Sequence, residues 1–328
     1  MPNKPLVAVS YRADEEYART TVEVLGDDAD VAFLRRLPEP DRPGVLASAD
    51  ALIGWNLSRE LAPEALQRAQ RLRFIQLLSA GADGVDFRSI PERLSLAGNV
   101  GAYAQPMAEH VLAMTLALAK RLPQRHAALA RGEFNQADPV LTLNGAICAI
   151  LGFGGIGSAT AALMRPFGAL IHAVNTSGRT DEDVDFIGTL ADLDSVLAVA
   201  DVIVISLPLT RATRGLIGAR ELSLTKPTAI VVNVARGAIL DEEALYRHLV
   251  EHPEFCAGID AWWNEPRGGA EFRTNFPFFD LPNVLGSPHN SGIVPGVLLA
   301  AAGKAAENVR RFLRGEPVTG VMRREDYL

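Results

Sequence analysis

The sequence contains little cysteine and no long hydrophobic run. Cys148 and Cys256 are the only cysteines among 328 residues, and both lie in apolar strand-like segments. We therefore expect two buried free thiols rather than a disulfide, a nucleophile or a cysteine metal site. The longest strongly apolar helical segment, 111–119, is far shorter than the ~20 residues that span a bilayer. Because the amino terminus also lacks a signal-peptide core, the sequence predicts a cytoplasmic protein.

Positive charge is also scarce, since 32 lysines and arginines face 39 acidic residues and the net charge is -7. This balance argues against a broad nucleic-acid or anionic-membrane surface, although it allows a local basic pocket for one phosphate. The composition, 48% hydrophobic and 22% charged, is that of a globular protein long enough for two domains. We expect a small-molecule partner, with no nucleic acid, no membrane and no metal.

A glycine fingerprint, Gly-Phe-Gly-Gly-Ile-Gly, occupies residues 152–157. The apolar run 146–151 precedes it and the small-residue stretch 158–164 follows it, which predicts a strand, a tight turn and a helix. Such a turn places a dinucleotide pyrophosphate at the helix N-terminus. A plain glycine-rich turn is the alternative, and the flanking pattern argues against it. The predicted cofactor contacts are Gly152, Gly154, Gly155, Ile156 and Gly157.

Short β-rich runs alternate with helical patterns along the chain. Six of them predict the strands of a parallel sheet, at 146–151, 169–175, 202–207, 229–234, 256–260 and 284–287. The amino-terminal part predicts a second, smaller α/β unit, with strands at 6–10, 51–55 and 73–78 and a helix at 63–72. Further helices are predicted at 105–121, 241–252 and 297–313.

Several motifs occur in the order of a known family: LLSAGADGVD (77–86), MAEHVLAMTLALAK (107–120), LGFGGIG (151–157), SLPLTRATRGLIG (206–218), VVNVARGAILDEEAL (231–245), GIDAWWNEP (258–266), LPNVLGSPHNSG (281–292) and AAENVRRFLRGEP (305–317). With them the chain resembles the D-isomer-specific 2-hydroxyacid dehydrogenases of the glyoxylate/hydroxypyruvate reductase kind. The resemblance implies an α/β fold in which a Rossmann-type doubly wound parallel sheet domain is inserted in a smaller, discontinuous flavodoxin-like α/β domain. It places the NAD(P)-binding domain at 100–287 and the substrate domain at 1–99 plus 288–328, with a homodimer built largely through the inserted domain.

Three side chains supply the parts for reducing a 2-oxoacid. Arg236 follows a predicted strand, so it emerges at the carboxyl end of the sheet, where its planar fork can hold carboxylate oxygens. A solvated surface arginine is the alternative. His289 is the proton donor that we favour among six histidines, because it follows a strand and precedes a glycine-rich turn. We expect His110, His126 and His172, in helices and a strand, to be structural. Glu265 matches the family residue that pairs with this histidine, and a neighbouring carboxylate favours a charged imidazole.

One competing motif, His248-Leu249-Val250-Glu251-His252, satisfies the H-x-x-E-H pattern of a zinc hydrolase. The same spacing occurs by chance on solvated helices, and Pro253 ends this helix at once. We interpret the segment as an exposed helical face.

The remaining contacts follow mainly from the resemblance. Small residues after the strand 73–78 leave backbone N–H groups for a carboxylate, as the family uses this segment, although a plain tight turn is the alternative. Trp55 could wall the pocket, and Trp262 and Trp263 could pack near the site. The predicted substrate contacts are Ser79, Ala80, Gly81, Trp55, Arg236 and His289. Further predicted cofactor contacts are Leu207, Pro208, Thr213, Val234, Ala235, Asp260 and Gly292.

The choice between nicotinamide cofactors rests on a departure from the fingerprint. In NAD-binding versions of the fingerprint, an aspartate or glutamate lies about 20 residues after it, at the end of the second strand. In this sequence the corresponding residue is Asn175. Thr176, Ser177 and Arg179 add hydroxyls and a guanidinium that suit a 2′-phosphate. We predict NADPH. NAD is the alternative, supported by the acids at 181–183.

The sequence thus predicts an NAD(P)-dependent reductase of small 2-oxoacids, with glyoxylate or hydroxypyruvate as the favoured substrates. Two alternatives stay open. One is a catalytically idle dinucleotide-sensing protein, against which the three catalytic side chains argue. The other is a formate, phosphite or 3-phosphoglycerate dehydrogenase of the same superfamily. The chain ends soon after the helix 297–313, so we expect no added regulatory domain.

Overall fold

A computed structural model describes residues 4–62, 64–266 and 269–328. The chain forms two compact units, one of Met1–Tyr103 with Val294–Leu328 and one of Ala104–Ile293. Both units are α/β, as predicted. Substrate binding by residues 1–99 plus 288–328 stays a prediction. NAD(P) binding by residues 100–287 stays one too.

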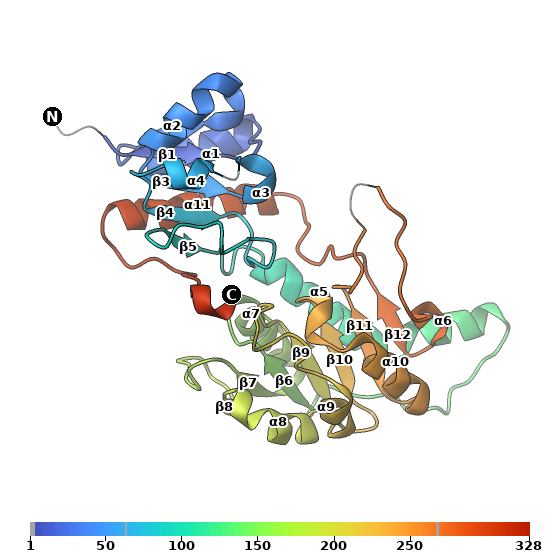
Figure 1. Ribbon diagram of the computed structural model, residues 1–328. Coiled ribbons are helices and arrows are strands. Elements are labelled where there is room, and N and C mark those ends of the chain that lie inside the picture. Colours follow the sequence, from blue (N-terminus) through green and yellow to red (C-terminus); the bar gives the residue numbers. More distant parts are fainter. Residues whose placement is uncertain (1–3, 63, 267–268) are drawn as a thin grey trace. The chain divides into compact units, whose positions relative to one another are not determined.

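The first unit has a parallel five-stranded sheet at its centre (Figure 1). Its order is β2-β1-β3-β4-β5, the flavodoxin-like order that was predicted. Because helices cover both faces, the central strands β1, β3 and β4 are almost wholly buried, and β1 and β3 carry no polar side chain. The strands are β1 (Leu6–Val9), β2 (Asp30–Phe33), β3 (Ala51–Gly54), β4 (Phe74–Leu77) and β5 (Ser95–Ala97).

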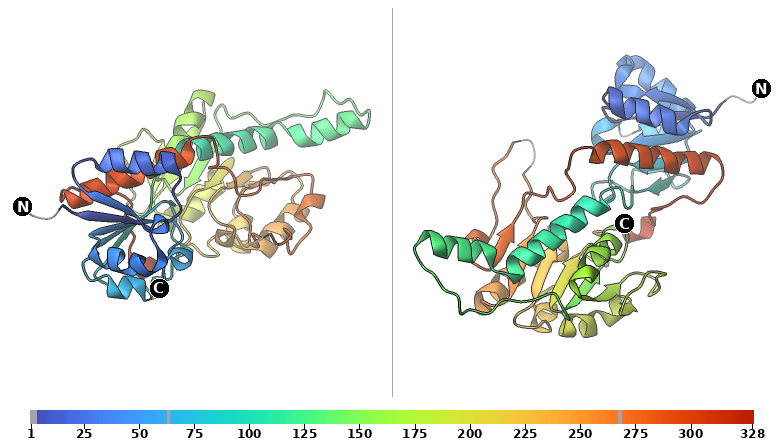
Figure 2. Two further views of the ribbon diagram at one scale, coloured as in Figure 1. Left: turned by 90° about the horizontal axis from the view of Figure 1, so that it is seen from above. Right: turned by 180° about the vertical axis from the view of Figure 1, so that it is seen from behind.

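Two layers of helices enclose this sheet (Figure 2). On one face, α1 (Glu15–Leu25) packs against α11 (Val297–Leu313), and Phe312 of α11 stacks on Phe74 of β4 with ring centroids 4.6 Å apart. The carboxyl-terminal segment is thereby tied to the amino-terminal sheet. The other face carries the shorter helices α2 (Arg42–Ser48), α3 (Leu57–Glu60) and α4 (Ala65–Arg68).

The second unit contains a parallel seven-stranded sheet. Its order, β12-β11-β10-β9-β6-β7-β8, is the Rossmann order extended by one strand, so the predicted doubly wound sheet is confirmed. The chain reverses its direction of winding between β6 and β9, which is the point where such sheets bind ligands. The strands are β6 (Ile147–Leu151), β7 (Leu170–Val174), β8 (Phe186–Gly188), β9 (Val202–Ile205), β10 (Ile230–Asn233), β11 (Cys256–Ile259) and β12 (Val284–Gly286).

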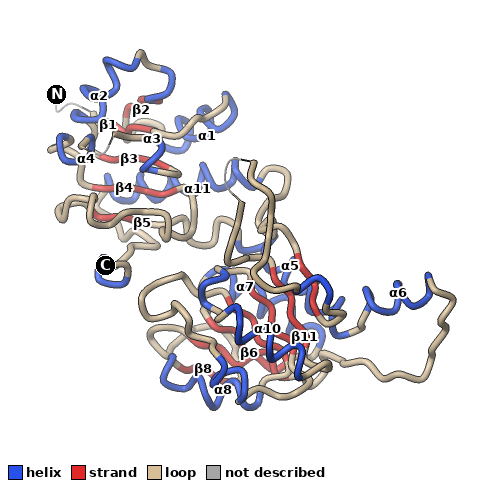
Figure 3. Tube along the Cα trace, turned by 45° about the vertical axis from the view of Figure 1, so that its right-hand side comes forward, coloured by secondary structure: helices blue, strands red, loops and turns tan. Residues whose placement is uncertain are grey.

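Helices again cover both faces of the sheet, as Figure 3 shows. One face carries α5 (Ala104–Ala119) and α7 (Gly155–Met164), and the other carries α8 (Leu193–Val199), α9 (Ala219–Ser223) and α10 (Glu242–Glu251). Cys148 and Cys256 are buried free thiols, as predicted, and burial raises the pKa of Cys148 to about 12. Among the described residues, no helix has the length and apolarity needed to cross a membrane.

One element of this unit extends beyond the sheet. Helix α6 (Leu122–Ala130) continues away from α5, and an irregular segment returns from it to β6 (Figure 2). We call residues 122–141 the arm. It carries five large apolar side chains that are at least 39% exposed: Leu122, Leu129, Phe134, Val140 and Leu141.

Candidate functional site

The predicted nucleotide and catalytic residues of the second unit gather at one edge of its sheet. All seven strands are parallel, so the loops that follow them emerge at the same carboxyl edge. These loops carry the glycine fingerprint after β6, Asn175 to Arg179 after β7, Leu207 and Pro208 after β9, Val234 to Arg236 after β10, Asp260 and Glu265 after β11, and His289 and Gly292 after β12.

Three of the four glycines of the fingerprint, Gly152, Gly154 and Gly157, differ in what surrounds them. Gly152 has φ +100°, and a Cβ there would lie 2.6 Å from the main chain of Ser206 and Leu207. A Cβ on Gly157 would lie 2.6 Å from the carbonyl oxygen of Gly152. Gly154, by contrast, has no described atom within 4 Å of that position. Two glycines therefore allow close packing inside the protein, while the third leaves space at its surface.

Gly154 is also the N-cap of α7, and no described side chain caps that helix end. An uncapped helix start beside open space suits an anion, because the N-terminal N–H groups and the helix dipole both favour negative charge. The geometry fits the pyrophosphate of a dinucleotide, with Gly154, Gly155, Ile156 and Gly157 as the residues that would hold it.

The loop after β7 is folded around the side chain of Asn175. Asn175 Oδ1 accepts hydrogen bonds from the N–H groups of Ser177 and Gly178 at 3.0 and 2.7 Å, and Nδ2 donates to the carbonyl oxygen of Arg179 at 2.8 Å. Asn175 therefore shapes the loop, as an Asx turn does. The side chains of Thr176, Ser177 and Arg179 are exposed. A carboxylate also reaches this region, because Glu182 accepts a hydrogen bond from Ser158 on α7.

The loop after β9 is held by Thr213. Its buried hydroxyl donates to the carbonyl oxygen of Pro208 at 2.6 Å and accepts from the N–H of Thr210 at 2.8 Å. These bonds fix the turn that begins at Leu207, whose main chain lies against Gly152. Thr213 is therefore part of the frame of the loop.

Arg236 follows β10 and is placed by the asparagine three residues before it. Asn233 is fully buried, accepts from the N–H of Ala235 at 3.0 Å and donates to the carbonyl oxygen of Arg236 at 3.0 Å. The next residue must be glycine, because a Cβ on Gly237 would lie 2.4 Å from the carbonyl carbon of Trp262. Asn233 and Gly237 thus fix the main chain on both sides of Arg236.

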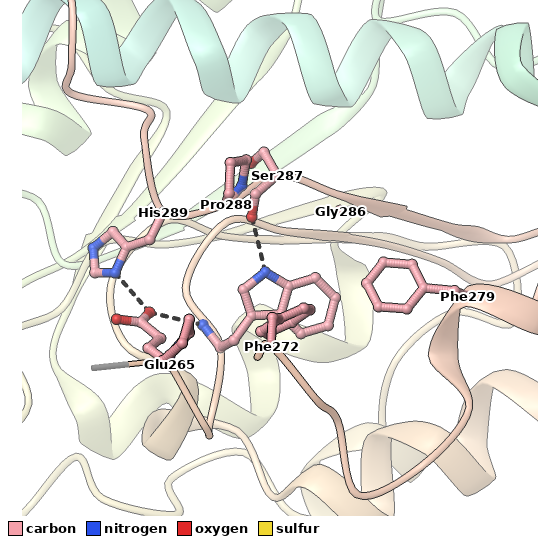
Figure 4. A pocket seen from close by; sticks show the side chains of 9 residues that line it. Glu265, Phe272, Phe279, Gly286, Ser287, Pro288 and His289 are labelled. Carbon is pink, nitrogen blue, oxygen red and sulfur yellow. Dashed lines mark hydrogen bonds and ion pairs between the residues drawn. The ribbon is translucent and has the colours of Figure 1, made fainter. Parts of the chain in front are cut away.

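Glu265 and His289 form a direct pair at this edge (Figure 4). Nδ1 of His289 lies 2.6 Å from Oε1 of Glu265, and the same oxygen accepts from the N–H of Trp262 at 3.1 Å. Burial alone would raise the pKa of Glu265, but its contacts with His289, the N–H of Trp262 and the charge of Arg236 hold it below its ordinary value. An ionised Glu265 is an acceptor only, so Nδ1 of His289 carries a proton and Nε2 is the nitrogen free to exchange one.

A cavity of about 440 Å³ adjoins this pair. In Figure 4 the aromatic side chains of Phe272 and Phe279 lie on one side of it, while Nε2 of His289 points away from them. The lining residues of the cavity are Trp262, Glu265, Pro266, Phe272, Phe279, Gly286, Ser287, Pro288 and His289. Trp262 packs at the site, as predicted, through its Nε1, which donates to the carbonyl oxygen of Ser287 at 2.8 Å.

The predicted substrate contacts of the first unit lie at the carboxyl ends of β3 and β4. Trp55 is 43% exposed, and its N–H donates to the carboxylate of Glu60 at 3.1 Å. In the segment Ser79 to Gly81, Ser79 Oγ donates to the carbonyl oxygen of Gly81 at 2.9 Å. Within the described residues no acceptor is bonded to the N–H of Ala80 or Gly81. Their roles as substrate contacts stay predictions.

The histidines of the H-x-x-E-H segment do not form the exposed face that the sequence suggested. The rings of His248 and His252 stack with centroids 4.2 Å apart, and His248 also meets Phe255 edge-on at 4.6 Å. Desolvation lowers the pKa of His248 to about 4. The expectation of a solvated face is wrong for His248, because the helix turns it toward the core. No three potential metal ligands cluster within the described ranges.

His110 and Ser287 are polar contacts of the site that the sequence did not assign to it. Nε2 of His110 lies 2.9 Å from Oγ of Ser287, and Ser287 donates to Asp260 at 2.5 Å. His110 lies in the motif MAEHVLAMTLALAK and Ser287 in the motif LPNVLGSPHNSG, both of which carried the family resemblance. Membership of these motifs was the one sequence signal that could have linked the two residues to the site. Nothing in either segment indicated that they meet.

The fold and the site together define a dinucleotide-binding α/β protein with an imidazole–carboxylate pair at its ligand edge. Residues 112–291, more than half of the chain, match the NAD binding domain of the D-isomer specific 2-hydroxyacid dehydrogenases. The chain belongs to this family.

Individual relatives agree with this assignment. The chain is 32% identical over 293 residues to glyoxylate/hydroxypyruvate reductase B of Pectobacterium carotovorum, covering 87% of this chain and 89% of that protein. It is 28% identical over 308 residues to D-3-phosphoglycerate dehydrogenase of Methanocaldococcus jannaschii, covering 92% of this chain but only 57% of that longer protein. A D-isomer specific 2-hydroxyacid dehydrogenase from Xanthobacter autotrophicus shares the fold, with a TM-score of 0.78, 24% identity and coverage of 98% and 99%.

Proposed function

We propose that this protein reduces a small 2-oxoacid to the D-2-hydroxyacid with a nicotinamide dinucleotide. The observation that carries the proposal is the Glu265–His289 pair, 2.6 Å apart, at the same sheet edge as an uncapped helix start with open space at Gly154. A protein that only binds a dinucleotide needs the helix start at Gly154 but not the Glu265–His289 pair. A reductase needs the pair as well, because the carbonyl oxygen of the substrate must receive a proton.

The protein's own groups would divide the work as follows. A bound reduced nicotinamide supplies the hydride that adds to the carbonyl carbon. His289, held through Nδ1 by Glu265, donates the proton on Nε2 to the carbonyl oxygen and is left neutral. Glu265 stabilises the imidazolium before transfer and fixes the direction in which the ring faces. The reverse reaction, oxidation of the hydroxyacid, uses the same pair as a general base.

Arg236 is the group that we assign to the substrate carboxylate. Its planar guanidinium can bind two oxygens in a fixed orientation, and charge-assisted bonds of this kind contribute about 1.5–3 kcal/mol each. The buried Asn233 and the close approach of Gly237 to Trp262 prevent the backbone from shifting. The arginine would thus orient the substrate before hydride transfer.

We propose NADPH as the preferred dinucleotide, with NAD as the alternative. An acid at position 175 would repel a 2′-phosphate, whereas Asn175 builds a loop that leaves Thr176, Ser177 and Arg179 exposed. The contact between Glu182 and Ser158 brings one carboxylate to the same region and opposes this preference. Arg179 and Glu182 are therefore the two charges whose balance decides it.

Glyoxylate and hydroxypyruvate are the substrates that we favour, in line with the activity named for the Pectobacterium relative. The test is reductase turnover with glyoxylate, hydroxypyruvate, pyruvate and phenylpyruvate, each with NADPH and NADH. Turnover of at least one 2-oxoacid supports the proposal. Absence of turnover with every acid, together with tight dinucleotide binding, would favour a dinucleotide-sensing protein. Oxidation of formate, phosphite or 3-phosphoglycerate in preference to all hydroxyacids would favour another member of the superfamily.

We further propose a homodimer formed through the second unit. The arm presents Leu122, Leu129, Phe134, Val140 and Leu141 to solvent, and apolar side chains concentrated on one protruding segment mark an association surface. The double variant Leu129→Ser with Phe134→Ser should sediment as a monomer where the wild type sediments as a dimer. A monomeric wild type would overturn the dimer without affecting the proposed reaction.

A further inference from the structure

A line of three polar side chains lies beneath the turn that carries His289. His110, on α5, places Nε2 2.9 Å from Oγ of Ser287, and that hydroxyl lies 2.5 Å from Oδ1 of Asp260. Asp260 is fully buried, and burial alone would raise the pKa of its carboxyl. Hydrogen bonds from Ser287 and Ser291 and the charge of His110 instead hold that pKa below its ordinary value. The carboxylate is thus ionised at neutral pH.

The ionised carboxylate fixes the direction of the whole line. A carboxylate only accepts, so the hydroxyl of Ser287 donates to Asp260. Its oxygen then accepts from His110, which must carry a proton on Nε2. Each of the three groups has a defined role, and removal of any one leaves a neighbour without its partner.

Asp260 also holds the backbone of the turn. Its carbonyl oxygen accepts from the N–H of His289 at 2.9 Å, and its carboxylate accepts from the N–H groups of Asn290 and Ser291 at 3.1 and 3.2 Å. His289 has φ +50°, in the left-handed region that a side chain with a Cβ disfavours. A residue in such a conformation persists only when its surroundings impose it. The bonds to Asp260 are the contacts that impose it here.

We propose that Ser287 and His110 are positioning residues for His289, acting through Asp260 to hold the left-handed turn that directs its imidazole toward Glu265. This inference rests on the proposed function in one respect, since His289 must be the proton donor for turnover to report it. Within the part of the chain that the structure describes, no hydrogen bond joins the ring of His289 to Ser287 or His110. Both act by fixing the carboxylate to which the turn is bonded.

The experiment compares Ser287→Ala with Ser287→Thr, which keeps the hydroxyl. Ser287→Ala should lower kcat for 2-oxoacid reduction about tenfold, since a misplacement of ~1 Å can cost up to 10²-fold, while the KM for the dinucleotide changes less than twofold. Ser287→Thr should recover most of the loss. His110→Ala should behave like Ser287→Ala, and His110→Gln, which can still donate from its amide, should be milder. Because the line acts as one unit, the double alanine variant should be no slower than either single one.

A buried hydroxyl elsewhere on α5 provides the control. Thr115 donates only to the carbonyl oxygen of Val111, within its own helix, so Thr115→Val should leave kcat unchanged. Proton NMR supplies a readout that does not need turnover. The downfield resonance of the Nδ1 proton shared by His289 and Glu265, assigned by its loss in His289→Gln, should shift in Ser287→Ala and return in Ser287→Thr.

The possible results separate the two claims. An inactive wild type overturns the proposed function, and the NMR comparison then decides the positioning role alone. Wild-type kcat and an unshifted resonance in Ser287→Ala overturn the positioning role. Equal losses in Ser287→Ala and Ser287→Thr also overturn it, because they would show that bulk rather than the hydroxyl matters.

Discussion

Oε1 of Glu265 lies 2.6 Å from Nδ1 of His289, and the histidine is held in a left-handed backbone conformation, φ +50°. The bond and the conformation together fix the ring, and in Figure 4 its Nε2 points away from Phe272 and Phe279. The imidazole of His289 therefore has a fixed direction, which the proposed role as proton donor requires. Arg236 lies on the loop after β10, the strand that pairs with β11, and Glu265 lies on the loop after β11. The positive charge of Arg236 acts on the carboxylate of Glu265.

The fingerprint glycines give a prediction that separates nucleotide binding from folding. Gly154→Ala adds a methyl group to open space, so the variant should keep its thermal stability but bind the dinucleotide at least tenfold more weakly. Gly157→Ala places its methyl 2.6 Å from the carbonyl oxygen of Gly152 and should lower Tm by several degrees. Thermal melts and dinucleotide titrations of both variants provide the check. Unchanged affinity in Gly154→Ala would show that no dinucleotide approaches there.

Arg236 should matter for both binding and turnover. Loss of a charge-assisted contact costs about 1.5–3 kcal/mol, so Arg236→Ala should lower kcat/KM for the 2-oxoacid by at least ~10-fold, with KM raised. Arg236→Lys keeps the charge but not the planar fork, and it should recover only part of the loss. Steady-state kinetics of the two variants are the measurement. Full recovery by lysine would mean that charge alone is sufficient.

The loop after β7 should decide the cofactor. Arg179→Ala should raise the KM for NADPH with little effect on NADH, because the guanidinium is matched only to the 2′-phosphate. Asn175→Asp should shift the preference toward NADH by like-charge repulsion, and Glu182→Gln should shift it toward NADPH. The quantity to measure is kcat/KM for both dinucleotides in each variant. A wild type that clearly prefers NADH would refute the assignment of this loop.

The first unit contains an ion pair, Asp50 with Arg71, whose contribution to folding stability should depend on pH. Asp50 is 8% exposed, accepts from the N–H of Leu6 at 2.9 Å and binds Arg71 through both oxygens. Burial would raise its pKa, but the bonds to Arg71 and Leu6 lower it below the ordinary value. A lowered pKa stabilises the fold above the pKa of the unfolded chain, and this stabilisation is lost as pH falls through the folded value.

Asp50→Ala should therefore lower the free energy of unfolding by about 1–3 kcal/mol at pH 7. The difference from wild type should shrink as pH falls below about 4, because Asp50 is protonated first in the unfolded chain and only at lower pH in the folded protein. Urea unfolding at pH 7 and pH 3 measures both values. Glu23→Ala, which removes an exposed pair with Arg19, is the control and should cost less than ~1 kcal/mol. A pH-independent difference would contradict the assigned role of the Asp50 carboxylate.

The sequence predicted most strands of both sheets and missed β2, β5 and β8. Six predicted strands of the second sheet are present, because runs such as 202–205 are continuously apolar and bounded by turn residues. β2, β5 and β8 have three or four residues each, lie at sheet edges and contain partly exposed residues, so each offers only a short apolar run. The pattern of apolar residues is too short in these segments to predict a strand.

The site shows the same limit. Arg236 and His289 could be found because each follows a strand, and Glu265 because it matches a family motif. The line from His110 through Ser287 to Asp260 could not, since it joins residues up to 177 positions apart. The sequence singled out Asn175 because it lacks the charge that would repel a 2′-phosphate, but it did not predict that this side chain bonds within its own loop. Side-chain partners depend on three-dimensional approach, which strand and helix patterns do not encode.

The central claim is that the Glu265–His289 pair delivers the proton during reduction of a 2-oxoacid. The most direct measurement is the single-turnover rate of dinucleotide oxidation in wild type and His289→Ala, at saturating substrate. We predict a loss of at least ~10²-fold, as expected for a general acid, with dinucleotide affinity unchanged. A near-normal rate in His289→Ala would contradict the account.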